Sequence, residues 1–133
     1  QILELIKTLV EQKKMSLLLI THDLGIVADV CDTVYVMYAG KIVEGGDVYS
    51  MYEEPKHPYT QGLLESALSI DEFRKNLETI RGIVPDLSNP PTGCRFHPRC
   101  EQTMPKCREK EPNLIRLGAN RRVACWKYEV VSQ

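Results

Sequence analysis

The hydrophobic pattern of the first third of the chain changes from a helical period to a continuous apolar run. The helical period predicts a helix over residues 1–13 and rests on five apolar residues: Ile2, Leu5, Ile6, Leu9 and Val10. Residues 16–20 contain no apolar–polar alternation, which is typical of a parallel strand buried on both faces. A second helical period follows near residues 23–31. This order of helix, strand and helix predicts the α/β class.

The next stretch predicts a hairpin. Residues 33–38 and 41–44 are strand-like runs on either side of the turn dipeptide at residues 39–40, Ala-Gly. The glycine pair at residues 45–46 is expected to end the second strand, because glycine has no side chain to pack in a sheet.

Three helices are predicted after the hairpin. Asp47 is suited to cap a helix that runs through Glu53, and Pro58 is suited to open the next one. Apolar spacing over residues 70–80 predicts a further short helix.

The character of the chain changes at Gly82. Prolines and a glycine then interrupt every candidate element, at positions 85, 90, 91, 93, 98, 105 and 112. A segment of this kind is expected to bury little apolar surface. Residues 82–133 therefore need an additional constraint, such as a bound metal, to hold one shape.

Composition and charge narrow the class of protein. The 133 residues have a formal net charge of −1, which argues against a nucleic-acid binder, since that role needs a basic face. No apolar run reaches the roughly 20 residues that span a bilayer. We therefore expect any membrane role to come through a partner protein.

A histidine motif follows the apolar run. The tripeptide Thr-His-Asp at residues 21–23 comes directly after the predicted strand, where ligands bind in open α/β sheets. By spacing alone, His22 is best explained as a residue that opens a helix. However, LLITHDL at residues 18–24, followed by MYAGKIVEGG at residues 37–46, resembles the ATP-binding subunits of ABC transporters in order and spacing.

The resemblance implies a role for His22 and a division of the chain. His22 would be the switch histidine, which contacts the γ-phosphate of ATP and the catalytic water. Residues 1–54 would be the C-terminal part of the P-loop ATPase domain, and residues 55–81 a helical connection. No G-x-x-x-x-G-K-[ST] phosphate loop occurs in the sequence. ATP and Mg²⁺ are therefore expected only in a full-length subunit, and whether this chain alone is an enzyme stays open.

A second set of motifs narrows the branch of the family. EPKHPYTQGLL at residues 54–64 and IRGIVPDL at residues 80–87 resemble the oligopeptide/dipeptide branch of ABC ATPases. That branch implies transport of peptides, or sometimes of nickel or sugars. Within this motif, His57 is interpreted as a loop residue before a helix-starting proline, with no ligand partner nearby.

Four of the five cysteines form a spaced set, the cysteine quartet: Cys94, Cys100, Cys107 and Cys125. Clustered thiols in a reducing compartment usually bind metal or act in catalysis. Four thiolates suit a closed zinc site or an iron–sulfur cluster, and zinc usually takes at least one close C-x₂₋₄-C pair, which is absent. The resemblance to peptide-type subunits implies a 4Fe–4S cluster, and zinc is the alternative. Residues 82–133 would then form a cysteine-rich, metal-binding C-terminal region.

The residues around the quartet have less specific expectations. His97 is expected beside the site and is also a candidate zinc ligand, and Trp126 is expected to shield the site from water. The arginines near the thiolates, Arg95 and Arg99 among them, would offset negative charge or be solvated. Cys31 is expected to be a small buried apolar residue. The predicted role of the metal is to hold the C-terminal region together.

Two functions remain under comparison. The leading hypothesis is the C-terminal part of an ATP-hydrolysing subunit that energises peptide import from the cytoplasmic face of the membrane. Its partners would be transmembrane permease subunits and a second ATP-binding subunit. The rival is a stand-alone iron–sulfur or zinc module for binding or redox sensing. Because residues 16–20 require cover on both faces, we also expect the chain to self-associate.

Overall fold

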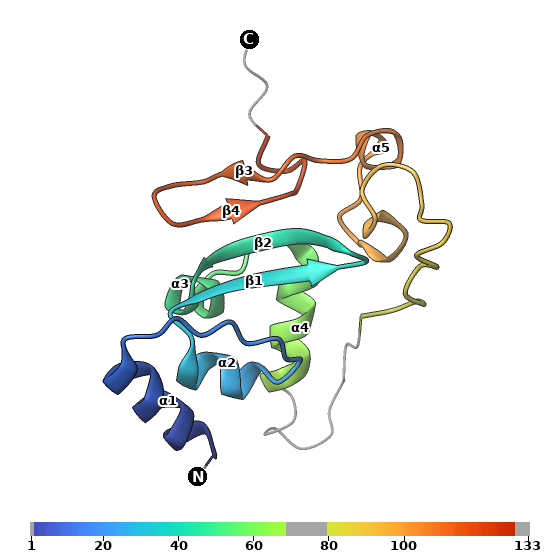
Figure 1. Ribbon diagram of the computed structural model, residues 1–133. Coiled ribbons are helices and arrows are strands. Elements are labelled where there is room, and N and C mark those ends of the chain that lie inside the picture. The colour runs from blue at the N-terminus through green and yellow to red at the C-terminus, as the bar shows by residue number, and fades with distance from the viewer. Residues whose placement is uncertain (1, 69–79, 130–133) are drawn as a thin grey trace.

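The computed structural model describes residues 2–68 and 80–129 (Figure 1). Its elements in chain order are α1 (Ile2–Lys13), α2 (Leu24–Val30), β1 (Thr33–Tyr38), β2 (Lys41–Asp47), α3 (Val48–Glu53), α4 (Pro58–Leu68), the 3-10 turn η1 (His97–Arg99), α5 (Pro105–Glu109), β3 (Ile115–Arg116) and β4 (Arg122–Val123). The α/β class is confirmed. Of the predicted helices, the one over residues 70–80 lies outside the described residues, except for Ile80.

Local capping explains why the short helices begin where they do. Asp23 precedes α2, and its Oδ1 accepts a hydrogen bond from the Ile26 backbone N–H at 3.1 Å. Asp47 precedes α3 and accepts from the Ser50 N–H at 3.0 Å. A side-chain acceptor at this position satisfies an N–H group that has no partner inside the helix. The predictions for these two helices and for the helix opened by Pro58 are confirmed.

The sheet is antiparallel, with the strand order β1-β2-β4-β3. β1 and β2 form the predicted hairpin, and its turn places Ala39 at φ 46° and Gly40 at φ 80°. Positive φ at both turn residues matches the right-handed twist of the flanking strands. β4 pairs with β2, so a segment of the proline-rich region extends the hairpin on the far side of β2 (Figure 1).

The glycine pair at residues 45–46 was predicted to end the second strand. This prediction is wrong, because β2 includes both glycines and continues to Asp47. A Cβ atom on Gly45 would lie 2.5 Å from the Tyr35 ring, and one on Gly46 would lie 2.5 Å from Cδ of Arg121. The missing side chains therefore let an aromatic ring and an arginine cross the strand at close range.

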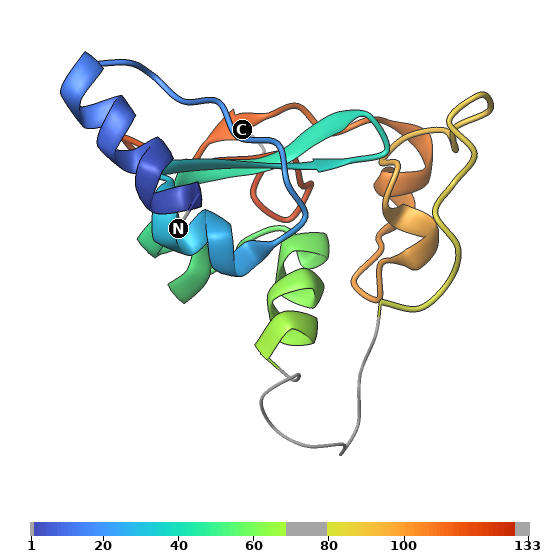
Figure 2. The same ribbon diagram turned by 60° about the horizontal axis from the view of Figure 1, so that its bottom comes forward.

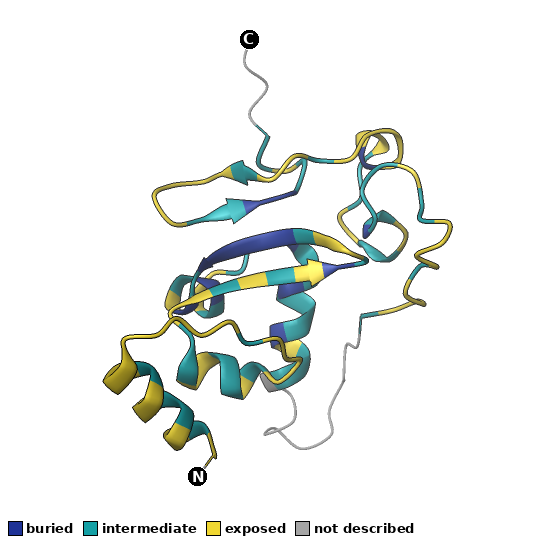
Figure 3. Cartoon of the chain, viewed as in Figure 1, coloured by how far each residue is buried: buried dark blue, intermediate teal, exposed yellow. Residues whose placement is uncertain are grey.

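The hydrophobic core lies between the hairpin, α4 and the segment before η1. Tyr38, Val43 and Phe96 are buried together, with the rings of Tyr38 and Phe96 edge to face at 5.1 Å. The Tyr59 ring, from α4, lies 4.6 Å from the Tyr38 ring. Figures 1 and 2 show α3 and α4 on the same side of the hairpin, and Figure 3 shows the buried residues along β2.

The strand predicted over residues 16–20 is wrong. These residues form no regular secondary structure, and Leu18 and Ile20 are 88% and 91% exposed. A strand forms only when neighbouring chains satisfy its backbone N–H and C=O groups. No described segment pairs with residues 16–20, and the sheet that does form is antiparallel instead of parallel. Within the described ranges, no helix is long and apolar enough to cross a bilayer.

Candidate functional site

The structure brings the cysteine quartet together around one small cavity, here called the cysteine cavity. Cys94 and Cys100 lie on either side of η1, Cys107 lies in α5, and Cys125 follows β4. The Cys94 backbone N–H donates to the Cys107 carbonyl at 2.8 Å, which fixes two of these segments side by side. Gly93 makes this approach possible, because its φ is 72° and a Cβ atom there would lie 2.3 Å from the same carbonyl.

Each sulfur of the quartet receives a backbone hydrogen bond. Three of the sulfurs accept from the residue two positions later in the chain: Phe96 for Cys94, Gln102 for Cys100 and Lys127 for Cys125. The fourth, Sγ of Cys107, accepts from the Met104 N–H at 3.5 Å. Hydrogen bonds of this kind favour the thiolate, which is the form that binds metals.

Burial opposes ionisation of these thiols in the absence of a cation. Burial raises the pKa of Cys94 to about 11, the Phe96 N–H lowers it, and the other three cysteines raise it further. Burial likewise raises the pKa values of Cys100 and Cys125, and their neighbouring cysteines add to the rise. A bound cation would remove this penalty, because it replaces repulsion between thiolates by attraction to a positive charge.

All four cysteines of the quartet line the cavity. In the described parts of the chain, no group of three or more His, Cys, Asp or Glu side chains is arranged to hold a single metal ion. The other walls include His57, His97, Trp126 and Lys127. Trp126 donates its Nε1–H to the Lys110 carbonyl at 2.8 Å, which holds the indole against the site.

His57 was interpreted as a loop residue without a ligand partner. This interpretation does not include its burial or its place in the wall of the cysteine cavity. His57 does precede the helix-starting Pro58, but its side chain is 1% exposed and lines the cysteine cavity. Its Nδ1 accepts a hydrogen bond from the Tyr59 N–H at 3.1 Å, and its ring lies 5.6 Å from the Phe96 ring. Burial lowers the pKa of His57 from 6.5 to about 4. The side chain is therefore neutral at physiological pH.

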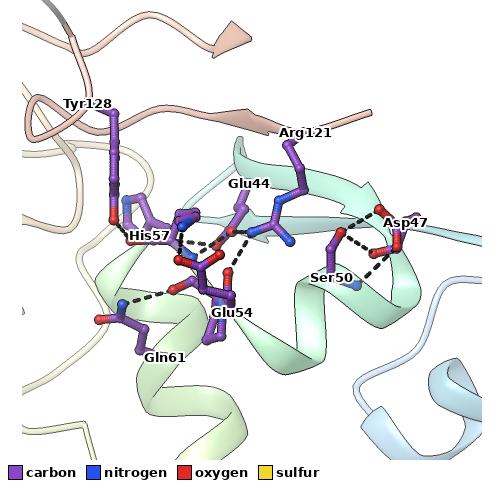
Figure 4. A network of polar contacts seen from close by, with 10 residues as sticks. Glu44, Asp47, Ser50, Glu54, His57, Gln61, Arg121 and Tyr128 are labelled. Carbon is purple, nitrogen blue, oxygen red and sulfur yellow. Dashed lines mark hydrogen bonds and ion pairs between the residues drawn. The ribbon is translucent and has the colours of Figure 1, made fainter. Parts of the chain in front are cut away.

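A buried carboxylate that the sequence pattern did not single out joins three segments of the chain (Figure 4). Glu44 on β2 is fully buried and accepts from the backbone N–H groups of Lys56 and His57 at 2.7 and 2.8 Å. It also accepts from Nη2 of Arg121 at 2.6 Å, and this nitrogen donates to the Glu54 carbonyl at 2.9 Å. The one available signal was the charge of Glu44 between the apolar Val43 and the glycine Gly45.

The arginines near the quartet do not line the cavity. Arg95 donates to the Ala39 carbonyl, and Arg99 donates to the carbonyls of Arg81 and Ile80 at 2.9 Å each. Together with Arg121, these side chains tie the C-terminal region to the hairpin and to residues 80–81. The expectation that they offset charge at the thiolates is replaced by an anchoring role.

His22 lies apart from the residues that line the cysteine cavity. It is exposed in the loop before α2. The Thr21 hydroxyl accepts from the Asp23 N–H at 3.0 Å, and Asp23 caps α2. These bonds hold the loop on both sides of His22, whose side chain is exposed. Cys31 is half-buried at the end of α2 and is also apart from the cavity.

Comparison with known proteins gives a consistent result. The family described as "Oligopeptide/dipeptide transporter, C-terminal region" matches residues 43–107. The oligopeptide transport ATP-binding protein AppD of Bacillus subtilis is 47% identical over 97% of this chain and 39% of its own length. The dipeptide transport ATP-binding protein DppD of Haemophilus influenzae is 46% identical over 94% of this chain and 38% of its own length.

A third relative, the dipeptide transport ATP-binding protein DppD of Caldanaerobacter subterraneus, is 41% identical over 96% of this chain. The chain thus spans less than two fifths of the length of each of these relatives. The family match covers most of β2, all of α3 and α4, and three members of the cysteine quartet. The chain therefore belongs to the family of oligopeptide/dipeptide transport ATP-binding proteins and corresponds to their C-terminal region.

Proposed function

We propose that the chain acts as the C-terminal part of an ATP-binding subunit that energises peptide import. The proposal rests on similarity to transport ATP-binding proteins over nearly the entire chain. The subunit would bind ATP and Mg²⁺ through segments outside this sequence. It would associate with permease subunits and a second ATP-binding subunit, as a peripheral protein on the cytoplasmic face of the membrane. No observation favours the stand-alone module as a second function.

The proposed contribution of His22 is to the chemical step. Its loop is braced by Thr21 and Asp23 while the imidazole is exposed, so the ring can be presented to a nucleotide held by another segment. There it would hydrogen-bond a γ-phosphate oxygen and orient the attacking water. An interaction of this kind acts on charge that develops during the reaction, so it affects turnover more than binding.

Replacing His22 tests this role in a subunit that contains this chain together with the phosphate loop. We expect His22→Ala to lower ATP turnover by at least ~100-fold, as is typical when one stabilising group is removed from a transition state. Nucleotide affinity should change by less than ~10-fold. Unchanged turnover in the assembled transporter would remove His22 from the site.

The second part of the proposal is that the cysteine quartet holds a 4Fe–4S cluster. Four sulfurs line one cavity, and each accepts a backbone hydrogen bond. Zinc requires its four ligands to meet at one ion, at about 2.3 Å from each sulfur. In a 4Fe–4S cluster each thiolate binds a different iron, so the ligands stand around the cluster and do not converge. The spacing of the quartet, which lacks a close C-x₂₋₄-C pair, is the feature that favours the cluster over zinc.

The cluster would act as a structural constraint. When bound, it would supply four strong bonds that link the segment around η1 to α5 and to Cys125, which follows β4. Lys127 in the cavity wall places a positive charge near the thiolates. The conformational entropy of ordering a chain costs ~1–2 kcal/mol per residue, and ligand bonds offset part of this cost in small metal-dependent folds.

Anaerobic preparation tests the metal directly. The chain should be brown, and iron and sulfide assays should give a ratio of about four of each per chain, as the cluster requires. Serine at any member of the quartet should abolish the colour, whereas Cys31→Ser should leave it intact. Stoichiometric zinc in a colourless protein would replace the cluster by a zinc site. An ordered, metal-free chain would overturn both.

A further inference from the structure

A second, larger hollow lies between the start of β2 and residues 111–114, which join α5 to β3; it is here called the hairpin groove. Its volume is about 430 Å³, which is in the range of pockets that bind small molecules. Figure 1 shows the turn between β1 and β2 beside the C-terminal region, where the groove lies. Neither the proposed cluster nor the proposed role of His22 accounts for this groove.

Most of the residues that line the hairpin groove are apolar. They include Ile42, Val43, Phe96, Pro112, Leu114 and Ala124. Val43, Phe96 and Ala124 are buried in the fold, whereas Leu114 is 40% exposed. A ligand with an apolar group would cover Leu114, which is favourable because it removes apolar surface from water.

The charged residues of the groove do not balance one another. Nζ of Lys41 lies 3.1 Å from the Glu111 carboxylate, so these two residues form a pair. Arg95 donates from Nη1 to the Ala39 carbonyl, and this nitrogen lies close to Gly40 in the hairpin turn. No carboxylate forms an ion pair with Arg95 among the described residues. The groove thus has two cations and one carboxylate, and a ligand with one negative charge complements it.

Asn113 indicates the neutral part of such a ligand. It lines the groove, and its side-chain amide has no hydrogen-bond partner in the described parts of the chain. This amide both donates and accepts hydrogen bonds, and a peptide group does the same. An alkyl chain has no group of this kind. A peptide therefore fits the groove better than a fatty acid does, although both carry a carboxylate.

We propose that the hairpin groove binds the C-terminal residue of a short peptide that has an apolar side chain and a free carboxylate. The carboxylate pairs with Arg95 and Lys41, where the positive charge is in excess. The apolar side chain lies against Leu114 and Phe96, and the preceding peptide group reaches Asn113. This site goes beyond the proposed function and depends neither on the cluster nor on ATP.

Fluorescence anisotropy with matched peptides tests the ligand class in the 133-residue chain. The probe is Gly-Ser-Gly-Leu with a rhodamine dye on its N-terminus. We expect saturable binding of the probe. A probe ending in a carboxamide should bind at least ~10-fold more weakly, because a hydrogen bond to a charged group is lost. A probe ending in glycine should also bind at least ~10-fold more weakly, because the apolar side chain is lost.

Two variants and a matched control test the site. Arg95→Met keeps an apolar stem but removes the charge, and should weaken binding at least ~10-fold. Leu114→Asp places a carboxylate beside that of the ligand and should abolish binding. Leu117→Asp is the control, because Leu117 is 37% exposed but lies outside the groove. It should change affinity by less than ~3-fold, as is typical of surface substitutions. Circular dichroism checks that each variant keeps its fold, and Leu114 is exposed, so its variant does not depend on repacking.

Each outcome supports or overturns the site. Equal affinities for the acid and carboxamide probes would overturn recognition of the carboxylate. Equal losses for Leu114→Asp and Leu117→Asp would overturn the location. Displacement of the probe by octanoate as readily as by the unlabelled peptide would replace the peptide by a fatty acid. Absence of saturable binding would overturn the inference as a whole, and the proposed roles of His22 and the cysteine quartet would be unaffected.

Discussion

The N-terminal segment, residues 2–32, and the C-terminal region, residues 82–129, differ in how local pattern relates to burial. α1 and α2 have a clear helical period and Asp23 caps α2, yet neither helix contains a buried residue. The C-terminal region is broken by prolines and has only short elements. It nevertheless contributes Phe96, Cys107, Val123 and Ala124 to the buried apolar residues (Figure 3).

This difference teaches that helix formation and core formation have different causes. A helix requires favourable backbone propensity and caps, which act between residues close in sequence. Burial requires a second surface. The C-terminal region obtains one because β4 pairs with β2 and Phe96 packs against Tyr38. In the N-terminal segment α2 contacts α3, but this contact leaves the apolar residues of the segment only partly buried or exposed.

The largest expected effect on stability comes from breaking the buried ion pair between Glu44 and Arg121, which links the hairpin to the C-terminal region. We expect Glu44→Ala to lower the free energy of unfolding by about 3–5 kcal/mol, because Arg121 would keep its charge at a site that is mostly buried. Glu111→Ala, which breaks an exposed pair with Lys41, should cost less than ~1 kcal/mol. Urea unfolding measures both. Similar losses would mean that the C-terminal region is not held through Glu44.

Two leucines in helices compare the exposed N-terminal segment with the packed middle of the chain. Leu64 in α4 is 8% exposed, whereas Leu5 in α1 is 59% exposed. We expect Leu64→Ala to destabilise the chain by about 2–5 kcal/mol, because it leaves a cavity, and Leu5→Ala to change stability by less than ~0.5 kcal/mol. A large loss for Leu5→Ala in urea unfolding would show that α1 is packed against another surface in solution.

Acid should weaken the packed part of the molecule through His57. Since burial lowers the pKa of His57 from 6.5 to about 4, the unfolded chain takes up this proton at a higher pH than the folded chain. The associated stability is complete above pH 6.5 and is lost as the pH falls toward 4. At about 1.4 kcal/mol per pKa unit, the loss approaches 3 kcal/mol. His57→Gln should lack this component when unfolding is followed between pH 7 and 4.

The smallest expected effect on stability is at the exposed apolar run, residues 16–20. We predict that the chain self-associates through this run, so Leu18→Ser should weaken association and change the unfolding free energy by less than ~0.5 kcal/mol. Tyr49→Ser is the control, because Tyr49 on α3 is similarly exposed but lies outside the apolar run. It should leave association unchanged. Sedimentation velocity measures the difference. A wild-type monomer at high concentration would contradict the prediction.

Much of the fold could be predicted because it depends on short-range signals. The caps at Asp23 and Asp47, the turn at residues 39–40 and the helix start at Pro58 act within a few residues. The strand over residues 16–20 failed because apolar character indicates a need for burial but does not supply a pairing partner. The prediction that the glycine pair ends the strand also failed. The glycines are needed there because the Tyr35 ring and the Arg121 side chain cross the strand at close range, and the local sequence does not show these contacts.

The candidate site could be predicted only in part, because some of its features depend on sequence spacing and others on contacts between distant segments. The number of cysteines and their spacing indicate a shared site, and the fold brings all four to one cavity. The local pattern around His57 indicates only a loop residue, and no pattern assigns Glu44 and Arg121 to a network. Nothing in the local sequence of Glu44 indicates that its partner lies 77 residues away.

The sequence by itself determined the helices with their caps, the hairpin, the family resemblance and the set of four thiols. The tertiary structure alone decided which of these features are buried and what they contact. It placed Glu44 between the loop before α4 and Arg121, and His57 in the wall of the cysteine cavity. The physical reason is that capping and turn formation depend on neighbours in the chain. Burial and pairing of charges depend on segments that only the folded path of the chain brings together.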